Sequence, residues 1–344
     1  MYRKIMDFLE EWKNEEHRKP LILQGARQVG KTYAILEFGR THYENVAYFN
    51  FETNPKLNET FEENISPDYL IPILSHIAGQ TIVTEKTLIV FDEIQLCERA
   101  LTSLKYFYEE RPDYHIIVAG SLLGVAVNRA RFSFPVGKVD MKTLYPMDLE
   151  EFMIAMGENS LVDQIKKCFE TNEPMPSALH DAAMQLYRQY LVVGGMPECV
   201  MQFAETKDYI LIRHTQDTIL ASYLNDMSKY NNLNEIKKTR LAYDNITVQL
   251  SKKNTRFQYK LIKKGGRASE FENAIEWLCL SGIVSQVYKV EQIRKPLENY
   301  RDIDAFKIYV SDLGLLCAKK DIVANDVLYM VEELNDFKGG MVEN

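Results

Sequence analysis

Short apolar segments alternate with amphipathic ones along the first 150 residues. Segments of strand length span 20–24, 46–51, 87–92, 115–120 and 138–144. Between them, 32–38, 69–77 and 99–110 carry apolar residues at helical spacing. Strands that alternate with helices form parallel sheets, because each helix crosses over the sheet before the next strand begins. The pattern predicts an α/β domain over 1–150, with a parallel sheet, flanking helices and ligands at the carboxyl edge of the strands.

The remaining residues follow a different pattern. Residues 151–235 are rich in helical periodicity, interrupted by Gly194, Gly195 and Pro197, and predict a helical subdomain. Over 236–320 we expect two helices, a longer helix at 269–280 and β-patterned segments at 284–293 and 307–312. This order is typical of a winged-helix domain. Residues 321–344 would then begin a further C-terminal domain.

Composition indicates a soluble protein of several units. The chain has 344 residues, 46% of them hydrophobic, and a formal net charge of −8. No apolar run approaches the roughly 18 residues of a membrane span, and the charged, amphipathic residues 1–19 do not resemble a signal peptide. Five scattered cysteines without a CxxC pair indicate neither disulfides nor zinc. We expect a cytoplasmic protein that does not bind membranes.

One glycine-rich motif follows the first strand directly. Residues 25–32, GARQVGKT, fit the phosphate-binding pattern GxxxxGKT between a strand and a helix. Backbone N–H groups of such a loop surround phosphate oxygens, while the lysine reaches the β- and γ-phosphates and the threonine ligates Mg²⁺. The expected ligands are ATP and Mg²⁺. The predicted binding residues are Gly25, Ala26, Arg27, Gln28, Val29, Gly30, Lys31, Thr32 and Tyr33.

A second motif, LIVFDE at 88–93, ends a buried strand in two adjacent carboxylates. This is a Walker B pattern, in which Asp92 would hold Mg²⁺ and Glu93 would polarise the attacking water. We therefore predict Glu93 and Lys31 as catalytic residues, with Ser121 as a third, and Thr32 and Asp92 as metal ligands. A simple P-loop kinase does not need the second acid.

Three further side chains are candidates at the same edge. Ser121 ends the strand 115–120, where ATPases with an additional strand carry a polar sensor, and it could equally cap a helix. Glu52 could approach the attacking water or lie on the surface. Gln95 could line the edge or remain an exposed loop residue.

Basic residues concentrate in two places. Arg129 and Arg131 are candidates for an arginine finger that would act on a neighbouring subunit, although a basic loop can also be simply solvated. Residues 251–269 contain no acid and seven cations, which could contact DNA phosphates with Phe257 and Tyr259 as neighbours. Acidic residues at 270, 272 and 276 oppose that interpretation, and docking of a protein partner is the alternative. The seven cations are Lys252, Lys253, Arg256, Lys260, Lys263, Lys264 and Arg267.

Taken together, these motifs resemble a prokaryotic family of uncharacterised ATP-binding proteins within the AAA+ superfamily. The resemblance rests on GARQVGKT, DEIQ at Asp92, AGSLLG at Ala119, SFPVGKV at Ser133, LYPMDLEEF at Leu144, GGMPE at Gly194, the stretch from Gln249 and FKIYVSDLGLLCA at Phe306. It covers nearly the whole chain. It implies an AAA+ fold of the additional-strand class, ATP binding and hydrolysis, a winged helix and a C-terminal region that resembles restriction endonucleases.

The sequence departs from this family near its end. FKGGMVEN leads into the C-terminal domain in the family, whereas here it ends at Asn344. Because the remaining residues of a nuclease site are absent, we expect a truncated C-terminal domain and no nuclease activity.

Two functions follow from the sequence. The first is Mg²⁺-dependent ATP hydrolysis coupled to a conformational switch, acting on or near DNA. The second is a nucleotide-regulated binding or scaffold protein with little hydrolysis, whose winged helix docks a protein partner or another copy of the chain.

Overall fold

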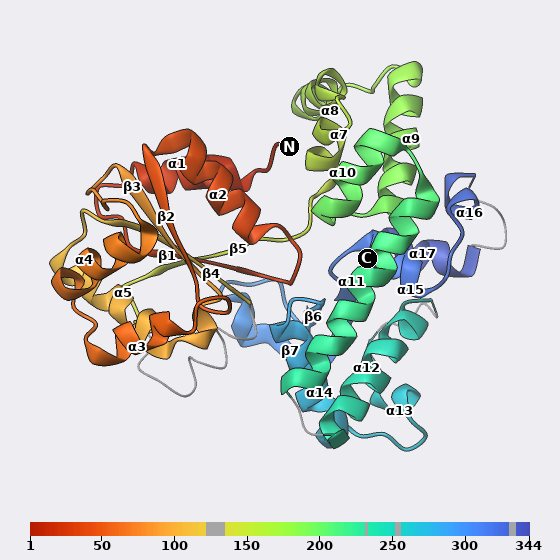
Figure 1. The fold of residues 1–344 in the computed structure, drawn as a ribbon. Helices are drawn as coiled ribbons and strands as arrows, with labels where there is room; N and C mark the ends of the chain where they lie inside the picture. Colours follow the sequence, from red (N-terminus) through yellow and green to blue (C-terminus); the bar gives the residue numbers. More distant parts are fainter. Residues whose placement is uncertain (122–134, 231–232, 252–255, 330–334) are drawn as a thin grey trace. The chain divides into compact units, whose positions relative to one another are not determined.

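A computed structural model describes residues 1–121, 135–230, 233–251, 256–329 and 335–344. The chain divides into two compact units (Figure 1). Arg3–Tyr145 forms what we call the N-terminal unit, and Pro146–Asn344 with Met1–Tyr2 forms the C-terminal unit. The finer boundaries that we expect near 235 and 320 stay predictions.

The N-terminal unit alternates helices and strands, as the hydrophobic pattern predicts. The strand expected at 87–92 has those bounds, and the others agree within a few residues at each end. The helix α3 was not expected. The elements are α1 (Ile5–Lys13), β1 (Leu21–Gly25), α2 (Lys31–His42), β2 (Asn45–Asn50), α3 (Lys56–Glu63), α4 (Pro67–Ala78), β3 (Thr87–Asp92), the 3₁₀ helix η1 (Ile94–Leu96), α5 (Glu98–Glu110), β4 (His115–Ser121) and β5 (Asp140–Thr143).

The five strands form one parallel sheet in the order β2-β3-β4-β1-β5. β4 is therefore inserted between β1 and β3, the strands that precede the two motifs. In the register, Gly25 lies opposite Ser121, and Asn50 lies opposite Asp92. Because all strands are parallel, their carboxyl ends meet at one edge. This edge carries both motifs.

Helices cover both faces of this sheet. On one face, buried side chains of β2, β3 and β4 such as Phe49, Phe91 and Val118 pack with those of α3, α4 and α5 in one core. On the other face lies α2, whose Gly39 has no room for a Cβ because Val46 and Leu88 pack against it. A sheet covered on both faces explains why its strands are almost continuously apolar.

The C-terminal unit is mainly helical. Among its described elements are two strands, which pair antiparallel. The elements are α7 (Leu149–Ala155), α8 (Asn159–Thr171), α9 (Ser177–Val193), α10 (Pro197–Thr206), α11 (Tyr209–Tyr230), α12 (Leu233–Ser251), α13 (Tyr259–Ile262), α14 (Ala268–Leu280), β6 (Val284–Val290), the 3₁₀ helix η2 (Leu297–Tyr300), β7 (Arg301–Val310), α15 (Leu313–Lys319), α16 (Ala324–Leu328) and α17 (Asn335–Glu343).

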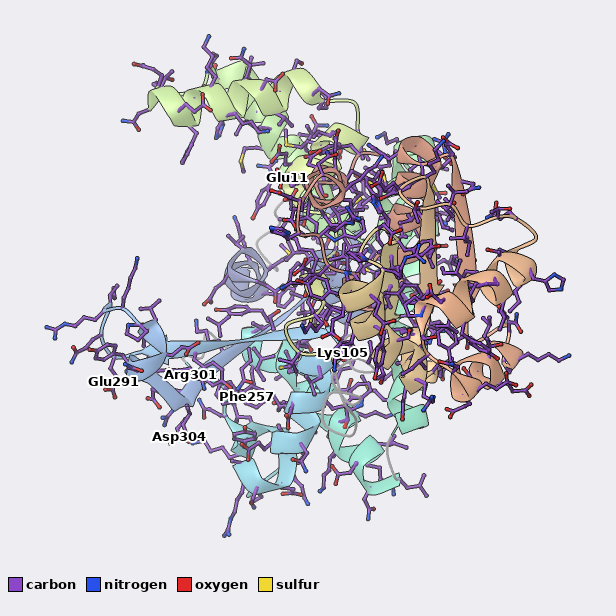
Figure 2. All side chains as sticks on the ribbon, turned by 90° about the vertical axis from the view of Figure 1, so that its left-hand side faces the viewer. Glu11, Lys105, Phe257, Glu291, Arg301 and Asp304 are labelled. Carbon is purple, nitrogen blue, oxygen red and sulfur yellow. The ribbon has the colours of Figure 1, made fainter. Side chains whose placement is uncertain are left out.

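The order α12, α13, α14, β6, β7 is the order of elements that we expected for a winged helix. Trp277, Leu278, Ile283 and Val284 are buried and form part of the core of this region. The hairpin end mixes charges: Glu291, Arg301 and Asp304 lie there (Figure 2), with the Arg301 guanidinium 4.5 Å from the centre of the Tyr288 ring. The order alone does not establish a winged helix, which stays an interpretation.

Three segments that lie far apart in the sequence, around Met147, Gly195 and Asp312, pack closely together in the C-terminal unit. Asp312 caps α15, where its Oδ1 accepts from the N–H of Leu315 (2.8 Å) and its Oδ2 from the N–H of Gly195 (2.6 Å). A Cβ on Gly195 would lie 1.9 Å from the carbonyl oxygen of Met147. We call these residues, with Gly194 and Gly314, the glycine–aspartate junction. Only glycine fits there, which explains the GGMPE motif in packing terms.

None of the described helices is long and apolar enough to cross a membrane.

Candidate nucleotide site

The loop between β1 and α2 has the backbone that a phosphate-binding loop requires. Gln28 and Gly30 adopt positive φ angles of 66° and 88°. Gly30 directly precedes α2, so the first N–H groups of that helix face the loop. Of the predicted binding residues, Gly25, Ala26 and Val29 are buried, while Arg27, Gln28 and Tyr33 are exposed. The loop can therefore offer backbone donors and exposed side chains to an anion.

The loop is anchored from two sides. A Cβ on Gly25 would lie 2.3 Å from the carbonyl oxygen of Leu144, so the end of β5 requires glycine at this position. Arg3 is buried, and its guanidinium donates to the carbonyl oxygens of Val29 (3.1 Å) and Tyr145 (2.7 Å). Sequence reasoning did not identify Arg3 as part of this loop's support, because its role depends on contacts far along the chain.

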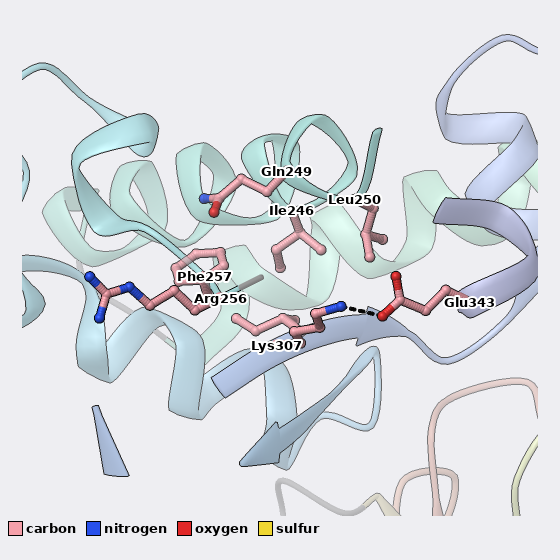
Figure 3. Close-up of a pocket in the computed structure, with 8 residues that line it drawn as sticks. Ile246, Gln249, Leu250, Arg256, Phe257, Lys307 and Glu343 are labelled. Atoms are coloured by element: carbon pink, nitrogen blue, oxygen red, sulfur yellow. Dashed lines mark hydrogen bonds and ion pairs between the residues drawn. The ribbon is translucent and has the colours of Figure 1, made fainter. Parts of the chain in front are cut away.

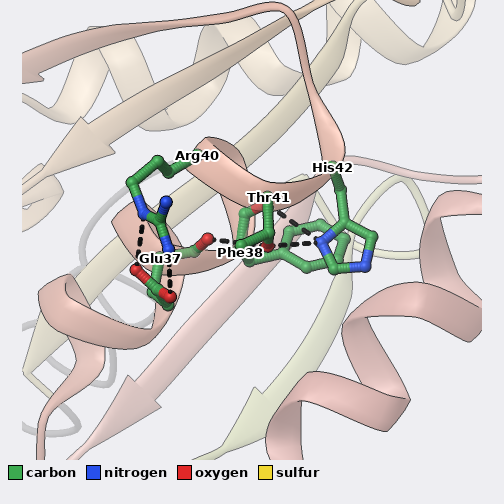
Figure 4. Close-up of polar contacts among 5 residues, drawn as sticks. All are labelled: Glu37, Phe38, Arg40, Thr41 and His42. Carbon is green, nitrogen blue, oxygen red and sulfur yellow. Dashed lines mark hydrogen bonds and ion pairs between the residues drawn. The ribbon is translucent and has the colours of Figure 1, made fainter.

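Helix α2 begins with the last two residues of the motif, and side chains at its C-terminal end contact one another. There the Arg40 side chain pairs with Glu37, and Nδ1 of His42 contacts the Thr41 hydroxyl (Figure 4). The His42 ring also stacks on Phe38 with 4.5 Å between centroids. Basic residues in the last turn of α2 interact favourably with the negative end of the helix dipole. The positive end of the same dipole lies at the phosphate loop.

Lys31 folds back over the loop. Its Nζ donates to the carbonyl oxygens of Gly25 (3.0 Å) and Ala26 (2.9 Å). Burial lowers the pKa of Lys31 to about 8, although the carboxylates of Glu93 and Asp92 oppose this shift. Within the described part of the chain its amine forms no ion pair, so it is a cation that an anionic ligand can neutralise.

Thr32 and Asp92 meet across the sheet edge. The Thr32 hydroxyl donates to Oδ2 of Asp92 at 3.0 Å, and Oδ1 of Asp92 accepts from the N–H of Glu93 at 2.9 Å. Asp92 is buried and Thr32 partly buried. The structure thus brings together the two predicted metal ligands, which lie 60 residues apart in the chain.

Two residues of β2 join this group, and the sequence analysis named neither. The Tyr48 hydroxyl donates to Oδ2 of Asp92 at 2.6 Å, and Nδ2 of Asn50 donates to the Tyr48 oxygen at 3.2 Å. Burial, and secondarily the bond to Asp92, raises the pKa of Tyr48 to about 12, so the hydroxyl keeps its proton. The available signal was a strand whose alternate positions 48 and 50 turn polar at its carboxyl end.

Glu93 occupies an unusual backbone position. Its φ and ψ are 54° and 40°, a left-handed conformation uncommon for residues other than glycine. The side chain is partly exposed and accepts a hydrogen bond from Nε2 of Gln95. The predicted water-polarising acid and the Gln95 candidate are therefore in contact. Such backbone strain often occurs at functional sites.

The remaining candidates differ in what the structure describes. Ser121 is partly buried and lies beside Gly25 in the sheet register. Glu52 is exposed, and its backbone N–H donates to Oδ1 of Asn50. Arg129 and Arg131 lie outside the described residues, so the arginine-finger hypothesis stays a prediction.

The donors at this edge suit Mg²⁺ with a nucleotide. A threonine hydroxyl beside a carboxylate offers hard oxygen ligands, which Mg²⁺ prefers, usually together with substrate phosphates. Among the residues that the structure describes, no group of three or more His, Cys, Asp and Glu side chains could hold a metal alone. The Thr32 hydroxyl and the Asp92 carboxylate therefore suit a cation that binds together with phosphates.

The basic segment before α14 is only partly as expected. The described cations Arg256, Lys260, Lys263, Lys264 and Arg267 are exposed. Lys263 pairs with Glu270 at 3.3 Å, and the Arg256 guanidinium extends away from the small pocket that contains the Lys307–Glu343 ion pair (Figure 3). Lys252 and Lys253 lie outside the described residues.

One suggested role in this segment was wrong. Phe257 is buried and stacks on Phe306 with 5.7 Å between ring centroids, so it belongs to the core and cannot stack on a nucleobase. The ring of Tyr259 packs edge-on against the ring of Phe257, with 5.4 Å between the two centroids. Apolar residues near cations in sequence were attributed to a ligand, although the hairpin needed them for its own packing.

Family comparison agrees with the geometry. Residues 17–153 match the family of the AAA domain, and residues 184–326 match a domain of unknown function, DUF8612. The first match covers the phosphate loop, both acidic residues and the whole sheet. The match supports an AAA domain of the P-loop ATPase type in this part of the chain.

One solved structure supports the fold. The chain is similar to the Walker-type ATPase PABY2304 of Pyrococcus abyssi, with 14% identity, a TM-score of 0.54, and coverage of 93% of this chain and 95% of that chain. Two others are too dissimilar for any argument: the Aeropyrum pernix Orc1 protein in complex with DNA (12% identity, TM-score 0.30, 95% and 92% covered) and the Thermotoga maritima RuvB branch migration motor (13%, 0.33, 89% and 90%). No curated protein matches the chain.

Proposed function

We propose that this protein binds and hydrolyses ATP with Mg²⁺ at the carboxyl edge of its parallel sheet, and that the nucleotide state switches its conformation. One observation carries the proposal. The Thr32 hydroxyl of the phosphate loop and the Asp92 carboxylate lie 3.0 Å apart, so a loop that binds phosphate and an acid that can hold a cation form one site.

Each residue has a distinct role in this proposal. The loop N–H groups and Lys31 bind the phosphates, and Ser121 contacts the terminal one. Thr32 and Asp92 would hold Mg²⁺, which would neutralise phosphate charge when bound. Glu93 accepts a proton from the attacking water, for which it must exchange its contact with Gln95 for one with that water.

Two substitutions test binding and hydrolysis separately. Lys31→Ala should lower ATP affinity at least about 100-fold, because it removes the cation that reaches the β- and γ-phosphates. Glu93→Gln should keep affinity within about threefold and lower turnover by about 10² to 10⁴, the usual contribution of a general base. Equilibrium binding of a fluorescent ATP analogue and steady-state phosphate release measure the two quantities.

Matched controls come from an exposed pair in the same unit. Lys86→Ala and Glu44→Gln remove the partners of a surface ion pair (2.8 Å) and should change neither quantity. Unchanged turnover in Glu93→Gln would eliminate Glu93 as the base. Binding without turnover in the unmodified protein would favour the alternative of a nucleotide-regulated scaffold, for which the Gln95 contact that occupies Glu93 is the supporting observation.

We also propose that the basic segment contacts nucleic acid. The five described cations are exposed and flank the turn at Gly265, just before α14. Converting Lys263, Lys264 and Arg267 to glutamate should abolish binding of a DNA duplex at low salt, because phosphate contacts dominate such affinity. The control is Lys166→Glu with Lys167→Glu on α8, which reverses two charges where the test variant reverses three. If the unmodified protein does not bind DNA, docking of a protein partner becomes the favoured function of the proposed winged helix.

A further inference from the structure

A chain of hydrogen bonds leads from the end of β2 to Asp92. Oδ1 of Asn50 accepts from the backbone N–H groups of Glu52 (2.9 Å) and Thr53 (3.0 Å). Two donors on the same atom identify that atom as the amide oxygen, so the NH₂ group of Asn50 faces Tyr48. The orientation of the Asn50 amide is therefore set by the turn that follows β2.

This orientation also sets the direction of the tyrosine hydroxyl. The Tyr48 oxygen accepts from Asn50 and must direct its own hydrogen elsewhere, and Asp92 is the acceptor at 2.6 Å. Tyr48 stands on the sheet face that α2 covers, since it shares that face with Val46 and Asn50 along β2. The ring brings the hydroxyl to the same carboxylate that the first turn of α2 contacts.

Oδ2 of Asp92 thus accepts two hydroxyl groups, from Tyr48 and Thr32. Oδ1 accepts the N–H of Glu93. A carboxylate bound at both oxygens from three directions cannot rotate without breaking at least one bond. Because Thr32 gives its hydrogen to Asp92, its oxygen lone pairs remain available to a cation.

Resting on the proposed function, we propose that Tyr48 is a positioning residue for Mg²⁺: its hydroxyl fixes the Asp92 carboxylate so that Thr32 and Asp92 are arranged for the cation before it arrives. Tyr48 does not take part in proton transfer in this scheme. Its loss should raise the Mg²⁺ requirement of nucleotide binding and leave the metal-free affinity of the loop unchanged.

Tyr48→Phe tests this, because it removes only the hydroxyl and keeps the ring. We would titrate Mg²⁺ into the protein with a fluorescent ATP analogue and measure binding of the same analogue in EDTA. The expected result is a rise of about tenfold in half-saturating Mg²⁺, the effect of losing one hydrogen bond to a charged group, with the EDTA affinity within twofold of the original.

The chain supplies a matched control and a reference. The Tyr43 hydroxyl contacts Nδ1 of His115 at 2.7 Å, at the opposite end of the sheet, so Tyr43→Phe should change neither measurement. Asp92→Asn should lose the Mg²⁺ dependence entirely.

Three results would overturn the inference. The first is an unchanged Mg²⁺ requirement in Tyr48→Phe. The second is an equal loss of affinity in EDTA, which would make Tyr48 a direct contact of the nucleotide or a general support of the fold. The third is a failure of the unmodified protein to bind the analogue with Mg²⁺, which would overturn the proposed function as well. The measurement on the unmodified protein therefore separates a failure of the proposed function from a failure of the Tyr48 inference.

Discussion

Asp92 and Asp312 are both buried aspartates, one in each unit, yet their partners differ in kind. Asp92 accepts two side-chain hydroxyls and one backbone N–H. Asp312 accepts the backbone N–H groups of Gly195 and Leu315. Hydroxyls can rotate and can also accept a hydrogen bond, whereas a backbone N–H can only donate along a direction set by the fold.

The difference separates a site from a structural junction. At Asp92, the Thr32 hydroxyl can turn toward an arriving ligand without any change of the backbone, while Tyr48 keeps the carboxylate in place. Around Asp312, glycines without space for a side chain hold the donors in place, so a change there disturbs the backbone itself. The kind of hydrogen-bond partner therefore tells more about the role of a buried acid than its burial does.

The largest expected effect is on the junction. Gly195→Ala places a Cβ 1.9 Å from the Met147 carbonyl oxygen, so it should destabilise the C-terminal unit by at least about 4 kcal/mol or prevent its folding. Urea unfolding followed by Trp277 fluorescence measures this. Gly157→Ala is the control, since open space surrounds that glycine and only its positive φ adds a cost of about 1 kcal/mol. Equal effects would show that the junction tolerates movement.

A pair of matched substitutions tests the comparison directly. In Asp312→Asn the new NH₂ group must face a fixed N–H donor, which should cost roughly 2 to 3 kcal/mol of unfolding free energy. In Asp92→Asn the new NH₂ group can take the Oδ2 position, where the Thr32 hydroxyl can turn to accept from it, so the cost should stay under about 1 kcal/mol while Mg²⁺-dependent binding is lost. Equal costs in urea unfolding would contradict the distinction.

The smallest expected effect is that the stabilities of the two units change in opposite directions as pH falls. Burial, aided by Arg18 and Lys13, lowers the pKa of His115 to about 3. Its unfolded form binds a proton below about 6.5, so this group removes about 2 kcal/mol of stability from the N-terminal unit as pH falls from 7 to 5. Burial raises the pKa of Asp312 to about 6, against its backbone donors. The folded form then binds the proton first, and the C-terminal unit gains stability over that range.

The two tryptophans allow this measurement, because Trp12 lies in the N-terminal unit and Trp277 in the C-terminal unit. Urea unfolding of Trp277→Phe and of Trp12→Phe at pH 7 and pH 5 reports on each unit in turn. The midpoints should shift in opposite directions, and His115→Gln should remove most of the N-terminal shift. Parallel shifts would exclude this assignment.

The sequence was sufficient for the features that depend on local backbone. The phosphate loop, the strand that ends at Asp92 and the helices α2, α4 and α5 follow from spacing and periodicity alone. The sequence did not predict the roles of Tyr48, Asn50 and Arg3, because these roles arise from strand register and from contacts up to 142 residues apart. Phe257 was attributed to a ligand for a related reason, since the hairpin ring that covers it lies 49 residues further along the chain. Composition cannot reveal such pairings.

The Arg3 contact has a practical consequence for anyone who prepares the protein. Arg3, just ahead of α1, holds the Val29 carbonyl of the phosphate loop, so the segment before α1 is part of the support of the candidate nucleotide site. A purification tag joined directly to Met1, or its cleavage remnant, would act within a few residues of that support. Nucleotide affinities should therefore be compared only between preparations that share the same N-terminal sequence.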